Sequence, residues 1–138
     1  MSASLSSRLA AVVDALPLVP GLRVLEFGCG PGAAAREVAR RVGPSGFVLG
    51  VDRSPKAIQQ ALAAEQLSNL AFRQSAVDVF ELEPGEAPYD LAFAIRVGAL
   101  DGRHPAQQAP SLARIAAALT PTGRLFIDGG TPLRELKL

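Results

Sequence analysis

Three glycines, Gly28, Gly30 and Gly32, alternate over five residues near the start of the chain. They follow a short apolar stretch with the character of a strand, residues 23–27, and they precede a helical pattern in residues 35–42. Glycine lets the backbone turn sharply and come close to a ligand. The following helix adds free N–H groups and the positive end of its dipole. The arrangement therefore favours an anion-binding turn, because a turn without a ligand would need only one glycine.

Two acids flank this turn and bear on the kind of ligand. Residues 28–33 formally fit the dinucleotide fingerprint, and Asp52 lies 20 residues beyond Gly32, where a ribose-binding acid belongs. Glu26, however, lies inside the apolar strand, where a carboxylate is costly unless it meets a cation or a hydrogen-bond donor. The phosphates of a dinucleotide would repel it, whereas the ammonium and sulfonium of S-adenosylmethionine would suit it. Glu26 could equally accept hydrogen bonds from N–H groups of its own loop, and the two roles are compatible.

Four stretches of the chain resemble the motifs of class I S-adenosylmethionine-dependent methyltransferases. Residues 24–32 are similar to the first motif of that family and residues 50–55 to the second. Residues 89–94 are similar to the motif of the fourth strand, and residues 118–125 to the turn before the fifth. The resemblance covers roughly residues 20–130, with the motifs in the family's order.

The resemblance implies a set of cofactor-binding residues. The backbone around Gly28 and Gly30 would contact the methionine part of the cofactor, and Asp52 would accept hydrogen bonds from the ribose hydroxyls. An acid after the third strand usually holds the adenine amino group. Counting along the chain places that position at Ala76, so Asp78 would need a longer strand or a bulge to reach it, and a solvated loop acid is the alternative. The predicted cofactor set is Glu26, Gly28, Cys29, Gly30, Gly32, Asp52, Arg53, Asp78, Val79 (through its backbone N–H) and Arg96.

Within this set, Cys29 is expected to be a small residue that fits the crowded turn, not a nucleophile. Methyl transfer from a sulfonium is a displacement at carbon in which the cofactor supplies the leaving group. The protein mainly aligns donor and acceptor, and a general base is optional. No obligatory catalytic signature is therefore expected.

The stretch from Arg96 to Pro105 is the best candidate for contact with a substrate, because it follows the fourth predicted strand. In this architecture ligands bind at the carboxyl ends of the strands. His104, the only histidine, could act as a base, and Arg96 or Arg103 could hold an acidic group of the substrate. The alternative is a surface loop whose charges are solvated. Arg96 and His104 are the candidate catalytic residues.

Strand and helix patterns alternate along the whole chain. Apolar stretches predict strands at residues 23–27, 47–51, 70–76, 91–95 and 125–128, with helical patterns between them. Crossover helices of this kind give a doubly wound, parallel α/β sheet. We expect one domain over residues 1–138, with an N-terminal helix in 1–19 and the core in 20–130. The fold would be the Rossmann-like methyltransferase fold with about five strands, without the family's sixth and seventh.

The end of the chain raises a structural question, since only residues 129–138 follow the fifth predicted strand. An exposed edge strand is normally covered or paired. Three explanations stay open: the C-terminal tail folds back over the edge, a second copy pairs there in a homodimer, or the chain is shortened relative to its gene.

Composition limits the remaining function classes. The 138 residues carry a net charge of +1 with an isoelectric point near 8.0, which gives no argument for a nucleic-acid surface. A single cysteine excludes an internal disulfide and fits a cytoplasmic location. No membrane segment, signal peptide or metal site is predicted. We expect a methyltransferase acting on a small molecule. The alternatives are a non-catalytic or partner-dependent S-adenosylmethionine-binding protein and, third, a nicotinamide-dependent oxidoreductase.

Overall fold

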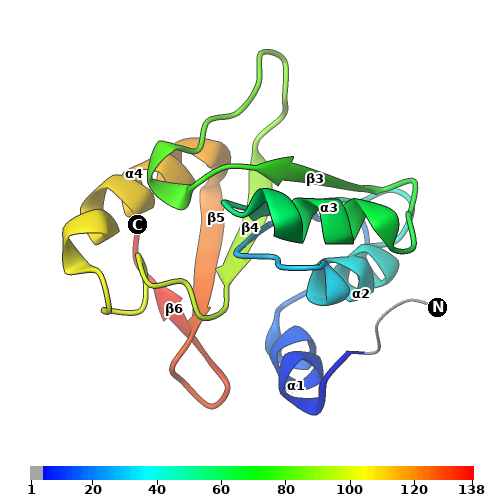
Figure 1. The fold of residues 1–138 in the computed structure, drawn as a ribbon, viewed down its shortest axis with the longest axis horizontal. Coiled ribbons are helices and arrows are strands. Elements are labelled where there is room, and N and C mark those ends of the chain that lie inside the picture. Colours follow the sequence, from blue (N-terminus) through cyan, green and yellow to red (C-terminus); the bar gives the residue numbers. More distant parts are fainter. Residues whose placement is uncertain (1–4) are drawn as a thin grey trace.

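The computed structural model describes residues 5–138 and consists of a six-stranded sheet with helices on both faces (Figure 1). The strands are β1 (Arg23–Phe27), β2 (Phe47–Asp52), β3 (Leu70–Gln74), β4 (Tyr89–Ala94), β5 (Leu119–Asp128) and β6 (Leu133–Leu136). The helices are α1 (Ser7–Ala15), α2 (Ala33–Val42), α3 (Pro55–Ala63) and α4 (Gln108–Ala118), with short 3-10 turns η1 (Val77–Val79) and η2 (Pro105–Gln107). None of the described helices is long and apolar enough to cross a membrane.

The strand order is β3-β2-β1-β4-β5-β6. The first five strands are parallel, and only β6 runs antiparallel to its neighbour β5. The chain moves outward from β1 to β3, and then crosses back to β4 on the other side of β1. This reversal places a topological switch point between β1 and β4, and the predicted doubly wound architecture is confirmed.

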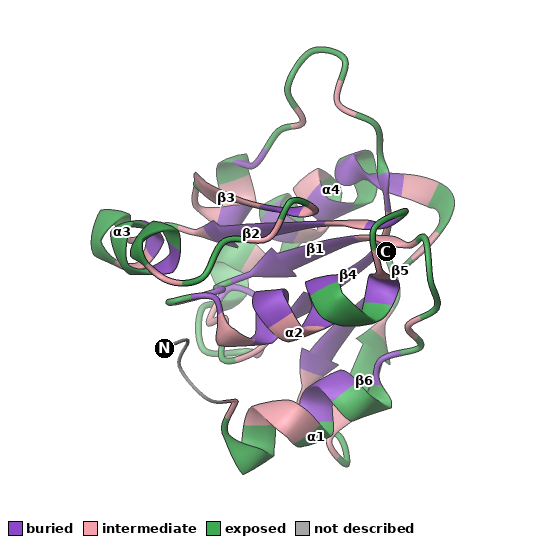
Figure 2. Ribbon diagram, turned by 90° about the vertical axis from the view of Figure 1, so that its right-hand side faces the viewer, coloured by how far each residue is buried: buried purple, intermediate pink, exposed green. Residues whose placement is uncertain are grey.

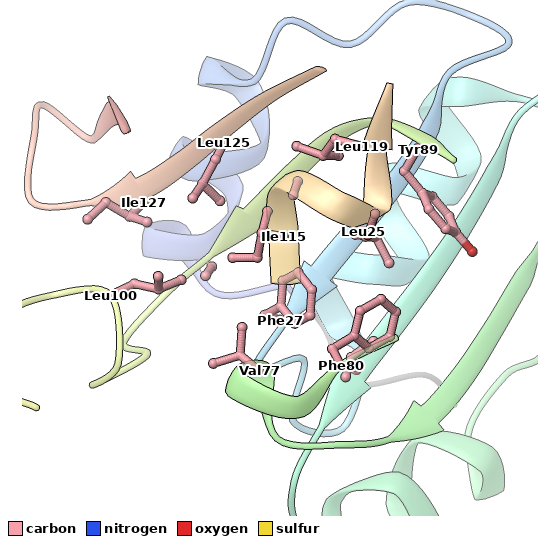
Figure 3. Packing of buried hydrophobic residues seen from close by; sticks show 14 of the residues in the cluster. Leu25, Phe27, Val77, Phe80, Tyr89, Leu100, Ile115, Leu119, Leu125 and Ile127 are labelled. Atoms are coloured by element: carbon pink, nitrogen blue, oxygen red, sulfur yellow. The ribbon is translucent and has the colours of Figure 1, made fainter. Parts of the chain in front are cut away.

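The sheet separates two hydrophobic cores. Figure 2 shows the mostly buried strands of the sheet lying between helices that are exposed on their outer sides. On one face α1 and α2 pack through residues such as Val13 and Val38 against the sheet. On the other face η1 and α4 pack through Phe80 and Ile115 against Leu25 and its neighbours (Figure 3). Because β1 and β2 are covered on both faces, nearly all their residues are buried, which explains their continuous apolar sequence.

The helix ends next to the cavity described below follow from local sequence. Helix α3 begins where expected, because the Ser54 hydroxyl accepts a hydrogen bond from the Ala57 N–H (3.2 Å) and Pro55 occupies the first turn. Helix α2 begins differently: its N-cap residue is Gly32, which has a left-handed φ of 91° and no side chain to cap the first turn. The first N–H groups of α2 therefore have no side-chain cap.

The structure corrects the predicted number of strands from five to six. The C-terminal tail turns back at residues 129–132 and pairs as β6 with β5, so that Asp128 faces Leu133 and Leu125 faces Leu136. Of the three explanations for the edge, the fold-back of the tail is the one observed. A second copy therefore has no open β5 edge to pair with.

Four strands also differ at their boundaries from the predicted ones: β2 and β4 by one or two residues at an end, and β3 and β5 for identifiable reasons. Strand β3 ends at Gln74, because the chain turns there into η1. Strand β5 begins at Leu119, before the predicted Pro121–Gly123 turn, because Leu119 already pairs with Tyr89. The register then shifts before Leu91 pairs with Arg124, so the turn sequence is accommodated as an irregularity within the strand.

Candidate functional site

A cavity of about 420 Å³ opens at the carboxyl ends of the parallel strands, at the switch point between β1 and β4. This is the place where open α/β sheets bind ligands. Its inner half is formed by the ends of β1 and β2 and the start of η1, and its outer half by the loop after β4. The inner half comprises Phe27, Gly28, Asp52, Arg53 and Ser75–Asp78; the outer half comprises Ile95–Ala99, Arg103, His104 and Gln107.

The glycine loop requires glycine for both conformational and steric reasons. Gly28, Gly30 and Gly32 all have positive φ angles, of 72°, 54° and 91°. A Cβ on Gly28 would lie 2.8 Å from the side chain of Val97, and one on Gly32 would lie 2.6 Å from the ring of Phe72. The loop is therefore packed between the loop after β4 and the end of β3. The backbone conformation and its packing therefore account for all three glycines, so the expectation that a turn without a ligand would need only one glycine is wrong, and the case for a ligand depends on the acids around the loop.

Asp52 ties the glycine loop to the end of β2. One carboxylate oxygen accepts a hydrogen bond from the Gly30 N–H (2.9 Å), and the other accepts one from the Ser54 N–H (2.9 Å). A carboxylate oxygen has two lone pairs, so both oxygens keep capacity for a further donor. Because Asp52 also lines the cavity, it can accept hydrogen bonds from a ligand while it holds the loop. It is thus more than a solvated acid at a strand end.

Glu26 is buried under the loop, with only 3% of its surface exposed. Its Oε1 atom has no hydrogen-bond partner within residues 5–138. Burial raises the pKa of the carboxyl from 4.5 to about 8, repulsion from Asp52 adds to the rise, and the backbone N–H of Ala35 opposes it. No hydrogen bond from an N–H of the glycine loop itself satisfies this oxygen. The free group is therefore protonated near neutral pH, and a cation such as an ammonium that reached the free oxygen would favour its ionised form.

Two further side chains support the loop from behind. The Cys29 thiol is buried, and burial together with the nearby Glu26 and Asp52 raises its pKa. A protonated, buried thiol agrees with the expected packing role. Arg36, on the first turn of α2, was missed by sequence reasoning because it stands among alanines in an ordinary helical pattern. It is 1% exposed and donates a hydrogen bond from Nη2 to the Pro31 carbonyl (2.8 Å).

The segment after β3 contributes the other wall of the inner half. The Ser75 N–H donates to the Asp52 carbonyl (3.0 Å), which continues the β2–β3 pairing by one residue. Asp78 lines the cavity from η1, without the bulge that the counting required. Val79 does not line it: the 3-10 turn leaves its side chain 60% exposed, and its N–H donates to the Ala76 carbonyl (3.4 Å). The structure thus gives no support to the predicted contact of Val79 with the cofactor, and Val77 borders the cavity at this point.

The loop after β4 brings the candidate residues Arg96 and His104 to the outer half of the cavity. Arg96 has a φ of 59°, which is unusual for a residue with a side chain. Its N–H donates to Asp128 at the end of β5 (3.2 Å), and its carbonyl accepts from Arg103 Nη2 (2.7 Å). The His104 ring packs directly against Gly98. The loop is therefore held from two sides, and both candidates face the same space.

The predicted site residues thus fall into three groups. Those that line the cavity are Gly28, Asp52, Arg53, Asp78, Arg96 and His104. Glu26, Cys29, Gly30 and Gly32 form or support the glycine loop without lining the cavity themselves. Val79 alone belongs to neither group. Sequence reasoning missed Val77, Val97 and Gln107, because apolar and amide side chains in loops carry no distinctive signal.

Comparisons with known proteins agree with this geometry. Residues 18–137 match a family model described as a methyltransferase domain. A trans-aconitate 2-methyltransferase of Methylobacterium nodulans is 36% identical over 120 residues, which make up 87% of this chain and 43% of that protein. A ribosomal RNA large subunit methyltransferase E of Desulforapulum autotrophicum is 34% identical over 115 residues, or 80% of this chain and 53% of that protein.

A solved structure shows the same fold. The crystal structure of an S-adenosylmethionine dependent methyltransferase from Mesorhizobium loti matches with a TM-score of 0.70 and 26% identity. The match covers 88% of this chain and 52% of that chain, so this chain spans about half the length of such relatives, or less. The family model nevertheless matches nearly all of it. The chain therefore belongs to the methyltransferase-domain family of S-adenosylmethionine-dependent enzymes.

Proposed function

We propose that this chain binds S-adenosylmethionine in the inner half of the cavity and transfers its methyl group to a small molecule in the outer half. The observation that carries the proposal is the pairing of two acids around the glycine loop. Asp52 is bonded to the Gly30 N–H at the cavity wall, and Glu26 is buried beneath with a free oxygen. A cofactor with ribose hydroxyls and an ammonium group fits both acids, since the ammonium would favour the ionised form of Glu26, whereas the charge of Asp52 would repel a pyrophosphate.

Each part of the site has a distinct task in this proposal. Glu26 attracts the ammonium of the methionine part, whose backbone contacts come from Gly28 and Gly30. Asp52 accepts hydrogen bonds from the ribose, and Val77 and Asp78 border the adenine. The tasks of Gly28, Asp52, Val77 and Asp78 follow from their positions along the inner half of the cavity, whereas those of Glu26 and Gly30 are inferred from the family resemblance and from their place in and beneath the glycine loop.

The chemistry requires alignment more than acid–base catalysis. S-adenosylmethionine supplies a methyl group on a positively charged sulfur, which departs as a neutral thioether. The chain's own contribution is to hold the acceptor in line with that methyl group. His104 is placed to take a proton from an acceptor that has one to lose.

A small acceptor agrees with the size of the cavity and the charge of the chain. About 420 Å³ lies within the usual range for small-molecule sites. A net charge of +1 gives no argument for an RNA-binding surface. Of the two relatives named above, one is a trans-aconitate methyltransferase and the other a ribosomal RNA methyltransferase, so the family alone leaves the acceptor open.

A second candidate function is cofactor binding that needs a partner for catalysis. It is favoured by the openness of the outer half, where Arg96, Arg103, His104 and Gln107 are all exposed. A partner chain could close this side. The cytoplasmic location suggested by the single cysteine remains a prediction.

Calorimetric titration with S-adenosylmethionine, S-adenosylhomocysteine and NAD tests the cofactor assignment. We expect saturable binding of the first two and none of NAD. Asp52→Ala should weaken binding at least tenfold, because it removes both the ribose acceptor and the tether of Gly30. Asp14→Ala, at an exposed position on α1, is the matched control. Preferential binding of NAD would contradict the proposal.

Turnover separates the two candidate functions. Production of S-adenosylhomocysteine is measured with a panel of small acids, alcohols and amines. Turnover by the isolated chain supports the methyltransferase proposal. Tight cofactor binding without turnover, across the panel, favours the partner-dependent candidate.

A further inference from the structure

The two halves of the cavity carry different charges. The inner half contains the carboxylates of Asp52 and Asp78, with Arg53 beside them. The outer half contains two guanidinium groups and one imidazole, and none of its described lining residues is a carboxylate. An acceptor bound there therefore meets hydrogen-bond donors and positive charge.

One of the two arginines is already engaged in holding the loop. Arg103 Nε lies 3.0 and 2.9 Å from the two carboxylate oxygens of Asp101, and its Nη2 lies 2.7 Å from the Arg96 carbonyl. The Asp101 contacts keep the only acid of this loop turned toward Arg103. Arg103 therefore fixes the shape of the loop and neutralises its one carboxylate.

The other arginine is free to bind a ligand. Within residues 5–138, the Arg96 guanidinium makes no hydrogen bond and no ion pair, although its backbone is fixed at both ends by Asp128 and Arg103. Asp128 ends β5, so Arg96 is anchored on the side of the switch point away from β2 and β3. That side is the acceptor side in the proposed function, because the other predicted cofactor residues belong to β1, β2, the loops after them and the segment after β3. Arg96 is thereby assigned to the acceptor instead of to the cofactor, where the sequence had placed it.

We propose that the methyl acceptor is a small carboxylic acid whose carboxylate is bound by Arg96, an inference that rests on the function proposed above. A guanidinium presents two parallel N–H groups to the two oxygens of a carboxylate, which gives both strength and orientation. The His104 ring packs against Gly98, which lies two residues after Arg96 in the loop. One of its ring nitrogens is a further hydrogen-bond donor on the same side of the cavity. The cofactor itself carries a carboxylate, so the test must distinguish the two sources of that group.

The test compares acids with their neutral amides. Succinate and succinamide, and benzoate and benzamide, are titrated by ligand-observed NMR into the protein saturated with S-adenosylhomocysteine. We expect each acid to bind at least tenfold more tightly than its amide. Arg96→Asn should abolish this preference; asparagine is chosen because it tolerates the left-handed φ of 59°. Arg96→Lys should retain part of it, and Arg114→Gln, at an exposed arginine on α4, should retain all of it.

Each outcome decides the proposal. The proposal is supported if Arg96→Asn keeps its affinity for S-adenosylhomocysteine but no longer binds the acids more tightly than their amides. If that variant loses affinity for S-adenosylhomocysteine instead, Arg96 binds the cofactor's carboxylate and the proposal is overturned. Equal binding of acids and amides by the unmodified protein overturns the acceptor class but leaves the proposed function intact. Failure of the unmodified protein to bind S-adenosylhomocysteine overturns both. Should Arg96→Asn unfold, the same comparisons are made with Arg96→Lys, which must then lower the acid preference.

Discussion

Replacing Glu26 by glutamine removes a buried charge while keeping the shape of the side chain. The pKa of Glu26 is raised from 4.5 to about 8, mainly by burial. Between these two pH values the folded protein holds a proton that the unfolded chain releases. The free energy of unfolding is therefore greatest below pH 4.5 and falls as the pH rises, until it levels off above about 8.

The structure sets the size of this effect. Each pH unit between these two values lowers the free energy of unfolding by about 1.4 kcal/mol. Between pH 4.5 and about 8 the total loss is therefore on the order of 5 kcal/mol. Glutamine mimics the protonated acid and has no such dependence. We expect Glu26→Gln to match the unmodified protein near pH 4.5 and to be more stable at pH 9. The gain at pH 9 should raise Tm by roughly 15 °C.

Denaturant unfolding at several pH values between 4.5 and 9 measures this difference directly. Glu81→Gln, at a side chain that is 71% exposed, serves as the control and should leave the pH dependence unchanged. The reasoning is refuted if the unmodified protein and Glu26→Gln lose stability equally between pH 5 and 8. Equal losses would mean that Glu26 ionises in the folded protein at an ordinary pH.

The same ionisation should couple cofactor binding to pH. An ammonium group at the free Oε1 atom favours the charged carboxylate, so binding below pH 8 should release a proton. Calorimetry in buffers of different ionisation enthalpy counts that proton. The affinity of the unmodified protein should rise by up to tenfold per unit between pH 6 and 8. Glu26→Gln should bind more weakly and without this rise.

Two further predictions concern the loop and the core. Gly28→Ala should destabilise the protein by about 2 kcal/mol or more, since it adds a contact of 2.8 Å with Val97 to the cost of its positive φ. Gly85→Ala, at a φ of 79° with open space around it, should cost only about 1 kcal/mol, and an equal loss in both variants would argue against the tight packing of the loop. Phe80→Ala should cost about 3–5 kcal/mol, because its ring is 1% exposed and packs edge-on against Phe27 at 5.2 Å. A loss below about 1 kcal/mol in denaturant unfolding would show that η1 is not part of the core.

The inner half of the site was largely predictable because its signals are local. The sequence signals of the inner half are the alternating glycines, the acid Glu26 inside an apolar strand, and Asp52, 20 residues beyond Gly32. Each of them indicates what the backbone or a ligand requires at that position of the chain. The register of β1 against β2 then brings Phe27 beside Val51, so that Gly28 and Asp52 meet at the same edge. The proximity of Gly28 and Asp52 could therefore be predicted from the parallel arrangement of β1 and β2 alone.

The remaining features depend on contacts that no local pattern records. Strand β6 has only four residues, and its pairing partner β5 determines whether it forms. Val79 was predicted to reach the cofactor through its backbone N–H, but the 3-10 turn η1 leaves its side chain exposed and places Val77 and Asp78 at the cavity. Arg36 is recognisable as a support of the loop only once the Pro31 carbonyl is seen within hydrogen-bond distance.

The composition of β6 has a consequence for the handling of this protein at high concentration. Among residues 5–138, β6 is an outermost strand of the sheet, so the backbone groups along its outer side have no partner there. Protein sheets associate edge to edge and aggregate at such strands. Two of its four residues, Arg134 and Glu135, are charged and exposed, and Lys137 follows directly. Short, charged strands at a sheet border oppose such association. The fold-back of the tail thus replaces the long, apolar border of β5 with one that keeps neighbouring molecules apart.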